Sequence, residues 1–280
     1  MSRVEAVLFD LDGTLTDSRL GILRSARYAF ERLSAAKGRA FPLPDDAELG
    51  WMIGPPLRES FGKLAGRENE EAAMAFYRQR YVPTGRFENA VYDGVPSALE
   101  ALRALGMRLF VATSKNEHDA RRILELFGLA SHFEGIHGAR DDGGHADKSE
   151  LIAHLLKHEG LEAGRDRIAM IGDRKFDAIG ARNVGIAAIG ALWGYGGREE
   201  LEAAGADALV ETPRQAPAAV AELFARVDRR AGDSDGENGR GADTKPTPDF
   251  DGVSIRQPAE IARQPYAGPL RDDPHAICRR

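Results

Sequence analysis

The sequence predicts an α/β fold with a doubly wound parallel sheet, an inserted all-helical segment and a disordered C-terminal tail. Short apolar runs alternate with helical stretches, which is typical of βαβ units and a parallel sheet. Over residues 17–90 the apolar residues have helical spacing and no convincing strand is present, so the alternation of strands and helices is interrupted there. From residue 228 the chain becomes rich in Gly, Asp, Arg and Pro. Such a segment cannot bury enough apolar surface to offset its ordering entropy.

Five apolar runs are the candidate strands. The first, Val4–Phe9, has β-branched residues and ends at the turn Asp10-Leu11-Asp12-Gly13, which predicts a buried strand followed by a tight turn. The later candidates are shorter and also end near polar residues or glycine. They lie at residues 109–112, 168–171, 187–191 and 208–210.

Helices are predicted between and beside these strands. Residues 116–127 end at Gly128, and residues 148–159 end at Gly160; each glycine is a plausible C-cap. Within the interrupted region, residues 19–33 and 68–81 have helical spacing. We therefore expect three parts. They are an α/β core domain of residues 1–16 and 91–227, a helical domain of residues 17–90, and a disordered tail of residues 228–280.

Composition excludes several functional classes. The 280 residues include 38 Lys and Arg against 44 Asp and Glu, a net charge of −6, and a mildly acidic chain is a poor binder of nucleic acid polymers. The single cysteine, Cys278, excludes an intramolecular disulfide and a cysteine-based zinc site. No apolar run approaches the ~20 residues of a membrane helix. The N-terminus lacks the pattern of a secretory signal. We expect a cytoplasmic protein that binds neither nucleic acid nor membrane.

Two aspartates follow the first predicted strand. Asp10 and Asp12 lie in a turn at its carboxyl end, where open α/β sheets bind their ligands. Two carboxylates this close need a cation or a proton, and oxygen ligands favour a hard ion such as Mg²⁺. An ordinary Asx-type turn would use the same residues, so this motif alone leaves both interpretations open.

Two further motifs could bind phosphate. Thr113 ends the second predicted strand, where a hydroxyl and the amides of a helix start could hold an anion, although Ser114 or Asn116 could simply cap that helix. Lys148 begins a predicted helix, where acidic residues are preferred. It could neutralise a phosphate, or it could be an ordinary solvated lysine.

The last acidic motif follows the third long apolar run. Asp173 and Asp177 are four residues apart, which places both on one face of a helix entrance. Acidic side chains there also suit the helix dipole, which is the simpler explanation. Because the carboxyl ends of parallel strands meet at one edge, these residues are expected to gather with the three earlier motifs.

In this order, the motifs resemble those of the haloacid dehalogenase-like phosphohydrolases. The matching segments are residues 9–16 (Phe-Asp-Leu-Asp-Gly-Thr-Leu-Thr), 111–114 (Val-Ala-Thr-Ser), Lys148 and 172–177. The resemblance covers roughly residues 4–225. It implies a Rossmann-like core, and the all-helical insertion is similar to that family's small cap. The dehalogenases that name the superfamily lack an acid at the position of Asp12, so this chain resembles the phosphatases.

The resemblance also implies catalytic roles. Asp10 would be the nucleophile that forms an aspartyl-phosphate. Asp12 would protonate the leaving oxygen and then deprotonate the attacking water. Thr113 and Lys148 would hold the transferring phosphoryl oxygens.

A Mg²⁺ site follows from the same resemblance. The ion would be held by Asp10, the backbone carbonyl of Asp12, and Asp173, with Asp177 supporting it through water. It would let an anionic carboxylate approach an anionic phosphate.

The substrate is expected to be a small phosphomonoester that contacts the cap and the strand ends. Arg58 is the best candidate for a leaving-group contact, and Thr14, Ser114 and Lys115 are further substrate-binding candidates. Phrases in both core and cap resemble bacterial 5′-nucleotidases, including Ile53-Gly54-Pro55-Pro56-Leu57. This favours nucleoside monophosphates. Phosphoglycolate phosphatase is the main alternative, and a sugar-phosphate phosphomutase is a further one. The sequence indicates no oligomeric state.

Two patterns predict no site by themselves. His154 and His158 are four apart on a predicted helix and could chelate zinc, but no third ligand accompanies them in the sequence. Residues 190–197 are rich in glycine after a strand, yet their spacing does not match a dinucleotide-binding fingerprint. We expect these residues to form a flexible loop near the site, with Trp193 and Tyr195 packing.

Overall fold

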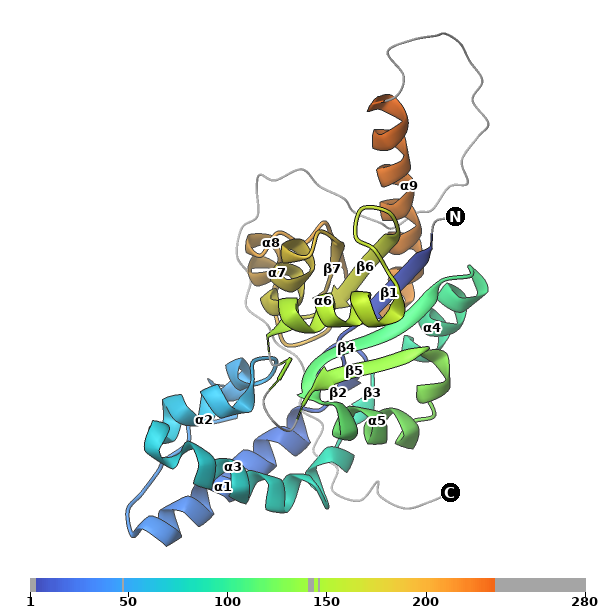
Figure 1. Cartoon of the computed structure of the whole chain (residues 1–280). Helices are drawn as coiled ribbons and strands as arrows, with labels where there is room; N and C mark the ends of the chain where they lie inside the picture. The colour runs from blue at the N-terminus through green and yellow to red at the C-terminus, as the bar shows by residue number, and fades with distance from the viewer. Residues whose placement is uncertain (1–3, 47, 141–143, 146, 235–280) are drawn as a thin grey trace.

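A six-stranded parallel sheet with helices on both faces forms the centre of the molecule (Figure 1). The computed structural model describes residues 4–46, 48–140, 144–145 and 147–234. The strand order is β5-β4-β1-β6-β7-β8, so the chain winds outward from β1 in both directions. The strands are β1 (Glu5–Phe9), β4 (Arg108–Asn116), β5 (Gly135–Ala139), β6 (Arg167–Gly172), β7 (Ala187–Ala191) and β8 (Ala208–Val210). The predicted doubly wound α/β fold is therefore confirmed.

Successive side chains of β1 point to opposite faces of the sheet, and the core has one layer on each face. Val7 and Phe9 pack on one face with helices α4 (Val95–Ala104), α5 (Glu117–Leu126) and α9 (Ala216–Ser234). Ala6 and Leu8 pack on the other with α6 (Lys148–Glu159) and α7 (Lys175–Asn183), beside α8 (Arg198–Ala203). Both faces of the sheet are thus covered, which is why its strands read as continuous apolar runs.

The segment of residues 17–90, which we call the helical segment, has an apolar core of its own. It contains α1 (Arg19–Lys37), α2 (Leu57–Ala65) and α3 (Glu70–Tyr81). The rings of Phe30, Phe61 and Tyr77 meet edge to face at 5.5 and 5.6 Å between centroids. The chain leaves the sheet through β2 (Thr16–Asp17) and returns through β3 (Ala90–Val91), and these two strands pair antiparallel. In Figure 1 the three helices lie to the lower left of the sheet.

Short 3-10 helices complete the described secondary structure: η1 (Glu48–Met52), η2 (Arg67–Asn69), η3 (Gly85–Phe87), η4 (Ala130–His132) and η5 (Pro213–Gln215). Helix α9 continues to Ser234 and so occupies the first residues of the predicted tail. Residues 235–280, where the rest of that tail was predicted, lie outside the described residues. Among the described helices, none combines the length and apolarity that crossing a bilayer requires.

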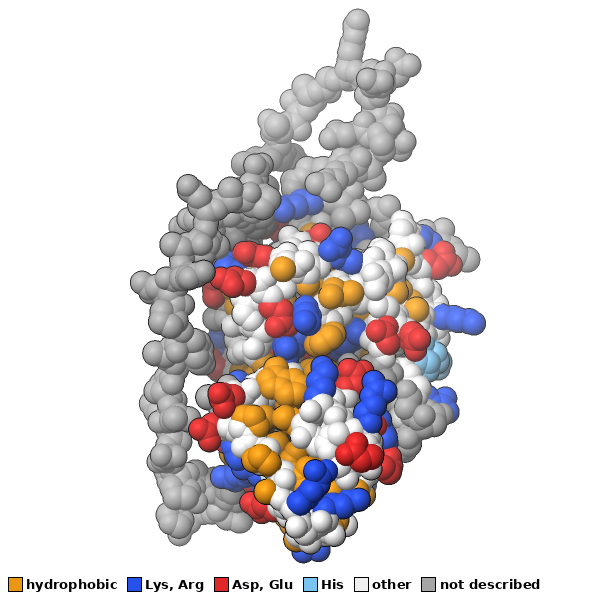
Figure 2. All heavy atoms as spheres, turned by 90° about the vertical axis from the view of Figure 1, so that its left-hand side faces the viewer, with side chains coloured by type: hydrophobic (Ala, Val, Ile, Leu, Met, Phe, Trp, Pro, Cys, Tyr) orange, Lys and Arg blue, Asp and Glu red, His pale blue; other side chains and the backbone are white. Residues whose placement is uncertain are grey.

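Surface charges of both signs are mixed on the side of the molecule that Figure 2 shows. There, Lys and Arg side chains alternate with Asp and Glu, and apolar side chains gather over the lower half, where the helical segment lies.

Candidate active site

The motifs of the sequence analysis meet at the carboxyl ends of β1, β4 and β6 and at the start of α6. The backbone N–H of Asp10 donates to the carbonyl of Ile171 at 3.0 Å, which continues the ladder from β1 to β6 just past the end of β1. The buried ammonium of Lys148 lies 3.1 Å from Asp10 Oδ1 and 2.8 Å from Asp177 Oδ1, and it donates to the carbonyl of Ala112 at 2.9 Å. The lysine predicted to be either functional or solvated is thus fully enclosed among carboxylates.

Three carboxylates share this buried space. One oxygen each of Asp10, Asp173 and Asp177 lies within 4.8 Å of the others. Burial raises the pKa of Asp10 to about 6 against the opposing effect of Lys148, and Asp177 and Asp12 raise it further. Burial also raises the pKa of Asp173 well above its usual range, again helped by its acidic neighbours. One ammonium cannot balance three carboxylates, so the donor set fits a hard divalent cation such as Mg²⁺.

The carboxylates of Asp10 and Asp177 keep the Lys148 side chain protonated. Burial alone would lower the pKa of this ammonium, but the carboxylates of Asp10 and Asp177 outweigh burial and raise it above its ordinary value. Lys148 is therefore a buried cation beside Asp10.

The raised pKa of Asp10 predicts a pH dependence of stability in the metal-free protein. The carboxyl keeps its proton up to about pH 6 when folded but loses it near pH 3.8 when exposed. Stability from this group is therefore fully present below pH 3.8 and is lost as the pH rises through 6. Two pKa units correspond to roughly 3 kcal/mol. In EDTA, the unfolding free energy of wild type minus that of Asp10→Asn should fall by about this amount between about pH 4 and pH 7.5.

Urea denaturation of both proteins measures this difference and cancels the titration of groups that do not interact with Asp10. Mg²⁺ is expected to remove the fall, because a cation stabilises the charged carboxylate that burial penalises. A difference that stays constant across the range, with and without Mg²⁺, would contradict the expectation.

Asp173 is held by the turn after β1 and by the loop of residues 190–197. Its Oδ1 accepts from the Thr14 hydroxyl at 3.2 Å, and its Oδ2 accepts from the backbone N–H of Tyr195 at 2.7 Å. Gly13 has a φ of +88°, and a Cβ there would lie 2.2 Å from Asp173 Oδ2. A Cβ on Gly194 would lie 2.3 Å from the Cβ of Asp173. Both glycines are therefore required for the backbone to enclose this carboxylate.

This arrangement revises two expectations. The Thr14 hydroxyl, predicted to bind substrate, is fully buried against Asp173 rather than among the residues that line the cavity described below. The loop of residues 190–197, predicted to be flexible, is tied down, because Trp193 Nε1 donates to the carbonyl of Thr14 at 2.9 Å.

Asp12 and Lys115 form the second charged pair. Lys115 Nζ lies 2.7 Å from Asp12 Oδ2, and it lies 5.1 Å from the centre of the Tyr81 ring. Asp12 Oδ1 is buried and finds no hydrogen-bond partner in the described part of the chain. Burial would lower the pKa of Lys115, but Asp12 and Tyr81 together outweigh burial and raise this pKa above its ordinary value. Lys115, considered from the sequence only as a substrate contact, also holds the carboxylate of Asp12.

A cleft of about 480 Å³ opens above these residues, between the strand ends and the helical segment. Asp10, Asp12, Thr113 and Ser114 line it from the sheet. Asn116 is the residue that caps α5, since its side chain accepts from the backbone N–H groups of His118 and Asp119. The hydroxyl-bearing residues before it therefore remain at the cleft.

The helical segment supplies a largely apolar wall. Met52, Met74, Tyr77 and Tyr81 line the cleft, and the two tyrosine rings stack with centroids 5.0 Å apart. Arg58 also lines it, but its guanidinium already forms ion pairs with Glu70 at 2.9 Å and Glu71 at 2.8 Å. The structure thus places Arg58 at the cleft while engaging it within the helical segment.

Two contacts between the helical segment and the loops around the site were not predicted from the sequence. The buried guanidinium of Arg174 donates to the carbonyl of Ile53 in the helical segment and to Glu200 Oε1 at 2.9 Å. The Tyr195 hydroxyl accepts from the backbone N–H of Ser18 at 2.8 Å and donates to Asp17 at 2.9 Å. These residues fix the helical segment to the loops around the site. An arginine directly after Asp173 was the available signal.

Comparisons with known proteins agree with this geometry. The family model described as haloacid dehalogenase-like hydrolase matches residues 7–191, which include the end of the first strand, the helical segment and every acidic motif. The chain is 45% identical over 203 residues to a 5′-nucleotidase of Pseudomonas aeruginosa, covering 72% of this chain and 88% of that protein. It is 41% identical over 192 residues to the tyrosine-protein kinase PtkA of Mycobacterium tuberculosis, covering 69% of this chain and 63% of that protein.

Solved structures show the same likeness. A predicted phosphatase from Clostridium acetobutylicum superposes with a TM-score of 0.69 at 36% identity, over 81% of this chain and all of that one. A hydrolase of the haloacid dehalogenase-like family from Streptococcus pneumoniae superposes with a TM-score of 0.69 at 29% identity, over 81% of this chain and all of that one.

Proposed function

Because the chain belongs to the haloacid dehalogenase-like hydrolases and is a phosphatase of that family, we propose that it hydrolyses nucleoside 5′-monophosphates with Mg²⁺ through an aspartyl-phosphate. One observation carries the chemistry. The buried carboxylate of Asp10 lies at the cleft, against a buried cation and within reach of two further carboxylates. A nucleophile for an anionic phosphoryl group needs this combination of negative charge and compensating positive charge.

The proposed steps use residues that line the cleft, together with the buried Lys148, which contacts Asp10. An oxygen of Asp10 attacks phosphorus as the bond to the leaving oxygen breaks, and Asp12 gives that oxygen a proton. Asp12 then takes a proton from water, which attacks the phosphorus and releases inorganic phosphate and the Asp10 carboxylate. Thr113 and Lys148 hold the phosphoryl oxygens, and Lys115 positions Asp12.

Mg²⁺ would be held by Asp10, Asp173 and Asp177, with the backbone carbonyl of Asp12 added by the family resemblance. When bound, the ion supplies positive charge that lets the carboxylate approach the phosphate. Thr14 and the N–H of Tyr195 orient Asp173 for this purpose, as partners of metal-binding side chains usually do.

The substrate class is inferred from the wall of the cleft and from the 45% identical 5′-nucleotidase. Tyr77, Tyr81 and two methionines offer apolar and aromatic surface that suits a nucleoside better than a two-carbon acid. A cleft of about 480 Å³ also has the size of a small-molecule site. Phosphoglycolate remains the alternative, since a phosphoglycolate phosphatase of Aquifex aeolicus is 28% identical and Arg58 and Arg78 line the cleft.

The test is phosphate release, with and without Mg²⁺, from nucleoside monophosphates, phosphoglycolate, hexose phosphates and phosphotyrosine. We expect Mg²⁺-dependent release with the highest kcat/KM for a nucleoside monophosphate. A preference for phosphoglycolate would keep the chemistry and replace the substrate. Alcohol product in excess of free phosphate would indicate transfer to an acceptor. Such transfer to a sugar phosphate would be the result expected of a phosphomutase. No release from any of these esters would contradict the proposal.

Arg58→Ala is expected to raise KM for the best nucleotide by about tenfold, while KM for a small aryl phosphate changes little, because only the larger leaving group reaches the cleft wall. Steady-state kinetics on both substrates measure this. Glu71→Ala is the matched control: it breaks one of the two ion pairs of Arg58 and removes a side chain that is 76% exposed. Equal effects of the two variants would show that Arg58 acts by holding the helical segment together rather than by contacting substrate.

A further inference from the structure

Four of the seven histidines gather at the edge of the sheet away from the Asp10 cluster. His137 lies on the edge strand β5, His154 and His158 lie on α6, and His145 precedes that helix. The rings of His137 and His158 are 5.3 Å apart between centroids, and His154 lies 6.1 Å from His137. His145 stacks on His154 at 4.2 Å. The third ligand that the sequence lacked beside His154 and His158 is thus brought from another element.

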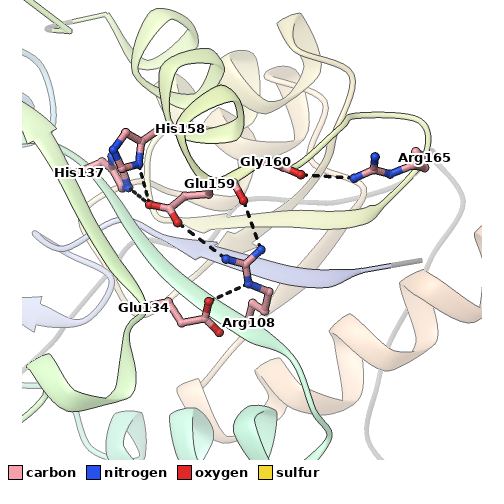
Figure 3. Close-up of polar contacts among 7 residues, drawn as sticks. All are labelled: Arg108, Glu134, His137, His158, Glu159, Gly160 and Arg165. Carbon is pink, nitrogen blue, oxygen red and sulfur yellow. Dashed lines mark hydrogen bonds and ion pairs between the residues drawn. The ribbon is translucent and has the colours of Figure 1, made fainter. Parts of the chain in front are cut away.

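Glu159 joins the two nearest imidazoles. Its Oε1 lies 2.9 Å from His137 Nε2 and 3.0 Å from His158 Nδ1 (Figure 3). Its other oxygen, Oε2, faces Arg108 Nη2 at 3.7 Å, and Arg108 is itself held by Glu134 at 2.7 Å. The arginine therefore turns the carboxylate so that one oxygen points at both histidines.

We propose that His137 Nε2, His158 Nδ1 and Glu159 Oε1 bind a borderline divalent transition-metal ion, for which Zn²⁺ is the probe. The three atoms lie within 4.8 Å of one another, and two histidines with one glutamate are an established Zn²⁺ donor set. Zinc bonds of about 2.0–2.1 Å at tetrahedral angles need ligand atoms about 3.3–3.4 Å apart. Each nitrogen–oxygen gap therefore opens by only a few tenths of an ångström when an ion enters.

The surroundings favour such an ion over Mg²⁺. Nitrogen ligands select zinc, copper or nickel, whereas the all-oxygen Asp10 cluster suits a hard cation. His158 is 63% exposed, so an ion can enter from solvent and the side chain can adjust. Beside it, a groove of about 520 Å³ is lined by His137, His145 and His154. A water molecule, or His154 after rotation, completes the coordination.

Metal binding needs unprotonated nitrogen. Arg108 beside Glu159 opposes a cation but also orients the carboxylate, as residues around metal ligands commonly do.

Titration calorimetry with Zn²⁺ tests the site, using tag-free protein stripped of metal and then saturated with Mg²⁺. We expect one saturable Zn²⁺ site, and an increase in Tm on binding, because the ion joins β5 to the end of α6. His158→Ala should weaken binding by at least about tenfold. This variant removes an exposed side chain, so loss of folding is not expected. His132→Ala, which removes an imidazole outside the cluster, should bind as wild type does.

Asp173→Asn distinguishes this site from the Asp10 cluster. Zn²⁺ binding that survives Asp173→Asn and is weakened by both His158→Ala and His137→Ala supports the proposal. Binding lost in Asp173→Asn, binding unchanged in both histidine variants, or no saturable binding would each overturn it. Because the readout is affinity and not turnover, failure here leaves the proposed phosphatase chemistry untouched.

Discussion

Asp10→Asn is expected to lower kcat for Mg²⁺-dependent phosphate release by about 10⁴-fold or more. The amide keeps the size of the carboxyl but is a poor nucleophile, so no aspartyl-phosphate can form. Lys148 and Asp177 remain in place around it, and a neutral group replaces a buried charge. The variant should therefore be folded and, in metal-free buffer at neutral pH, at least as stable as wild type.

Steady-state kinetics and circular dichroism of the same preparation check both parts. Asp93→Asn makes the same chemical change at a side chain that is 94% exposed, and it should retain full activity. Acid-quenched wild type incubated with ³²P-labelled substrate should retain label that Asp10→Asn does not. Near-normal Mg²⁺-dependent turnover by Asp10→Asn would refute the assignment of the nucleophile.

Lys148→Met is expected to destabilise the protein as well as inactivate it. Removing the ammonium leaves the buried carboxylates of Asp10 and Asp177 without their cation. Breaking a buried ion pair from one side costs about 3–5 kcal/mol of unfolding free energy. Turnover should fall by about 10²–10³-fold, because a preorganised charge on the phosphoryl oxygens is lost.

Urea denaturation in EDTA measures the stability loss, and Mg²⁺ should restore part of it by supplying positive charge to the same carboxylates. Lys157→Met is the matched control, since it replaces an exposed lysine near the other end of α6. Equal stability of the two variants in EDTA would mean that Lys148 does not neutralise the Asp10 cluster.

The sheet could be predicted where its strands are apolar on both faces. The runs around β1, β4 and β6 are buried between two helical layers. Because both faces of these strands are buried, their residues are nearly all apolar, and the sequence shows them as apolar runs. Strand β5 was missed because Gly135-Ile136-His137-Gly138-Ala139 carries one large aliphatic side chain. It joins the sheet through backbone pairing with β4, and a Cβ on Gly138 would lie 2.6 Å from the carbonyl oxygen of Lys115. Backbone hydrogen bonds and close approach leave little trace in a hydropathy pattern.

The candidate site shows the same division. Asp10, Asp12 and Asp173 could be singled out because polar residues directly after apolar strands must lie at one sheet edge. Lys148 could be singled out because it begins a predicted helix, where acidic residues are preferred. The pairing of Lys115 with Asp12 could not, and neither could the bridge from Arg174 to Ile53. These contacts depend on how the helical segment and the loops pack against the sheet. The spacing of residues along the chain does not predict that packing.

By itself, the sequence determined the fold class, the edge at which the polar motifs gather and the residue types available there. The spacing of apolar residues in a helix and the position where a strand ends are local properties of the chain. They can be recognised in the sequence because buried segments are apolar. Only the tertiary structure decided which charges meet. It enclosed Lys148 between two carboxylates, turned Thr14 toward Asp173 and brought His137 to His158 and Glu159. Electrostatic pairing depends on separations of a few ångströms between distant segments, and those distances exist only once the chain has packed.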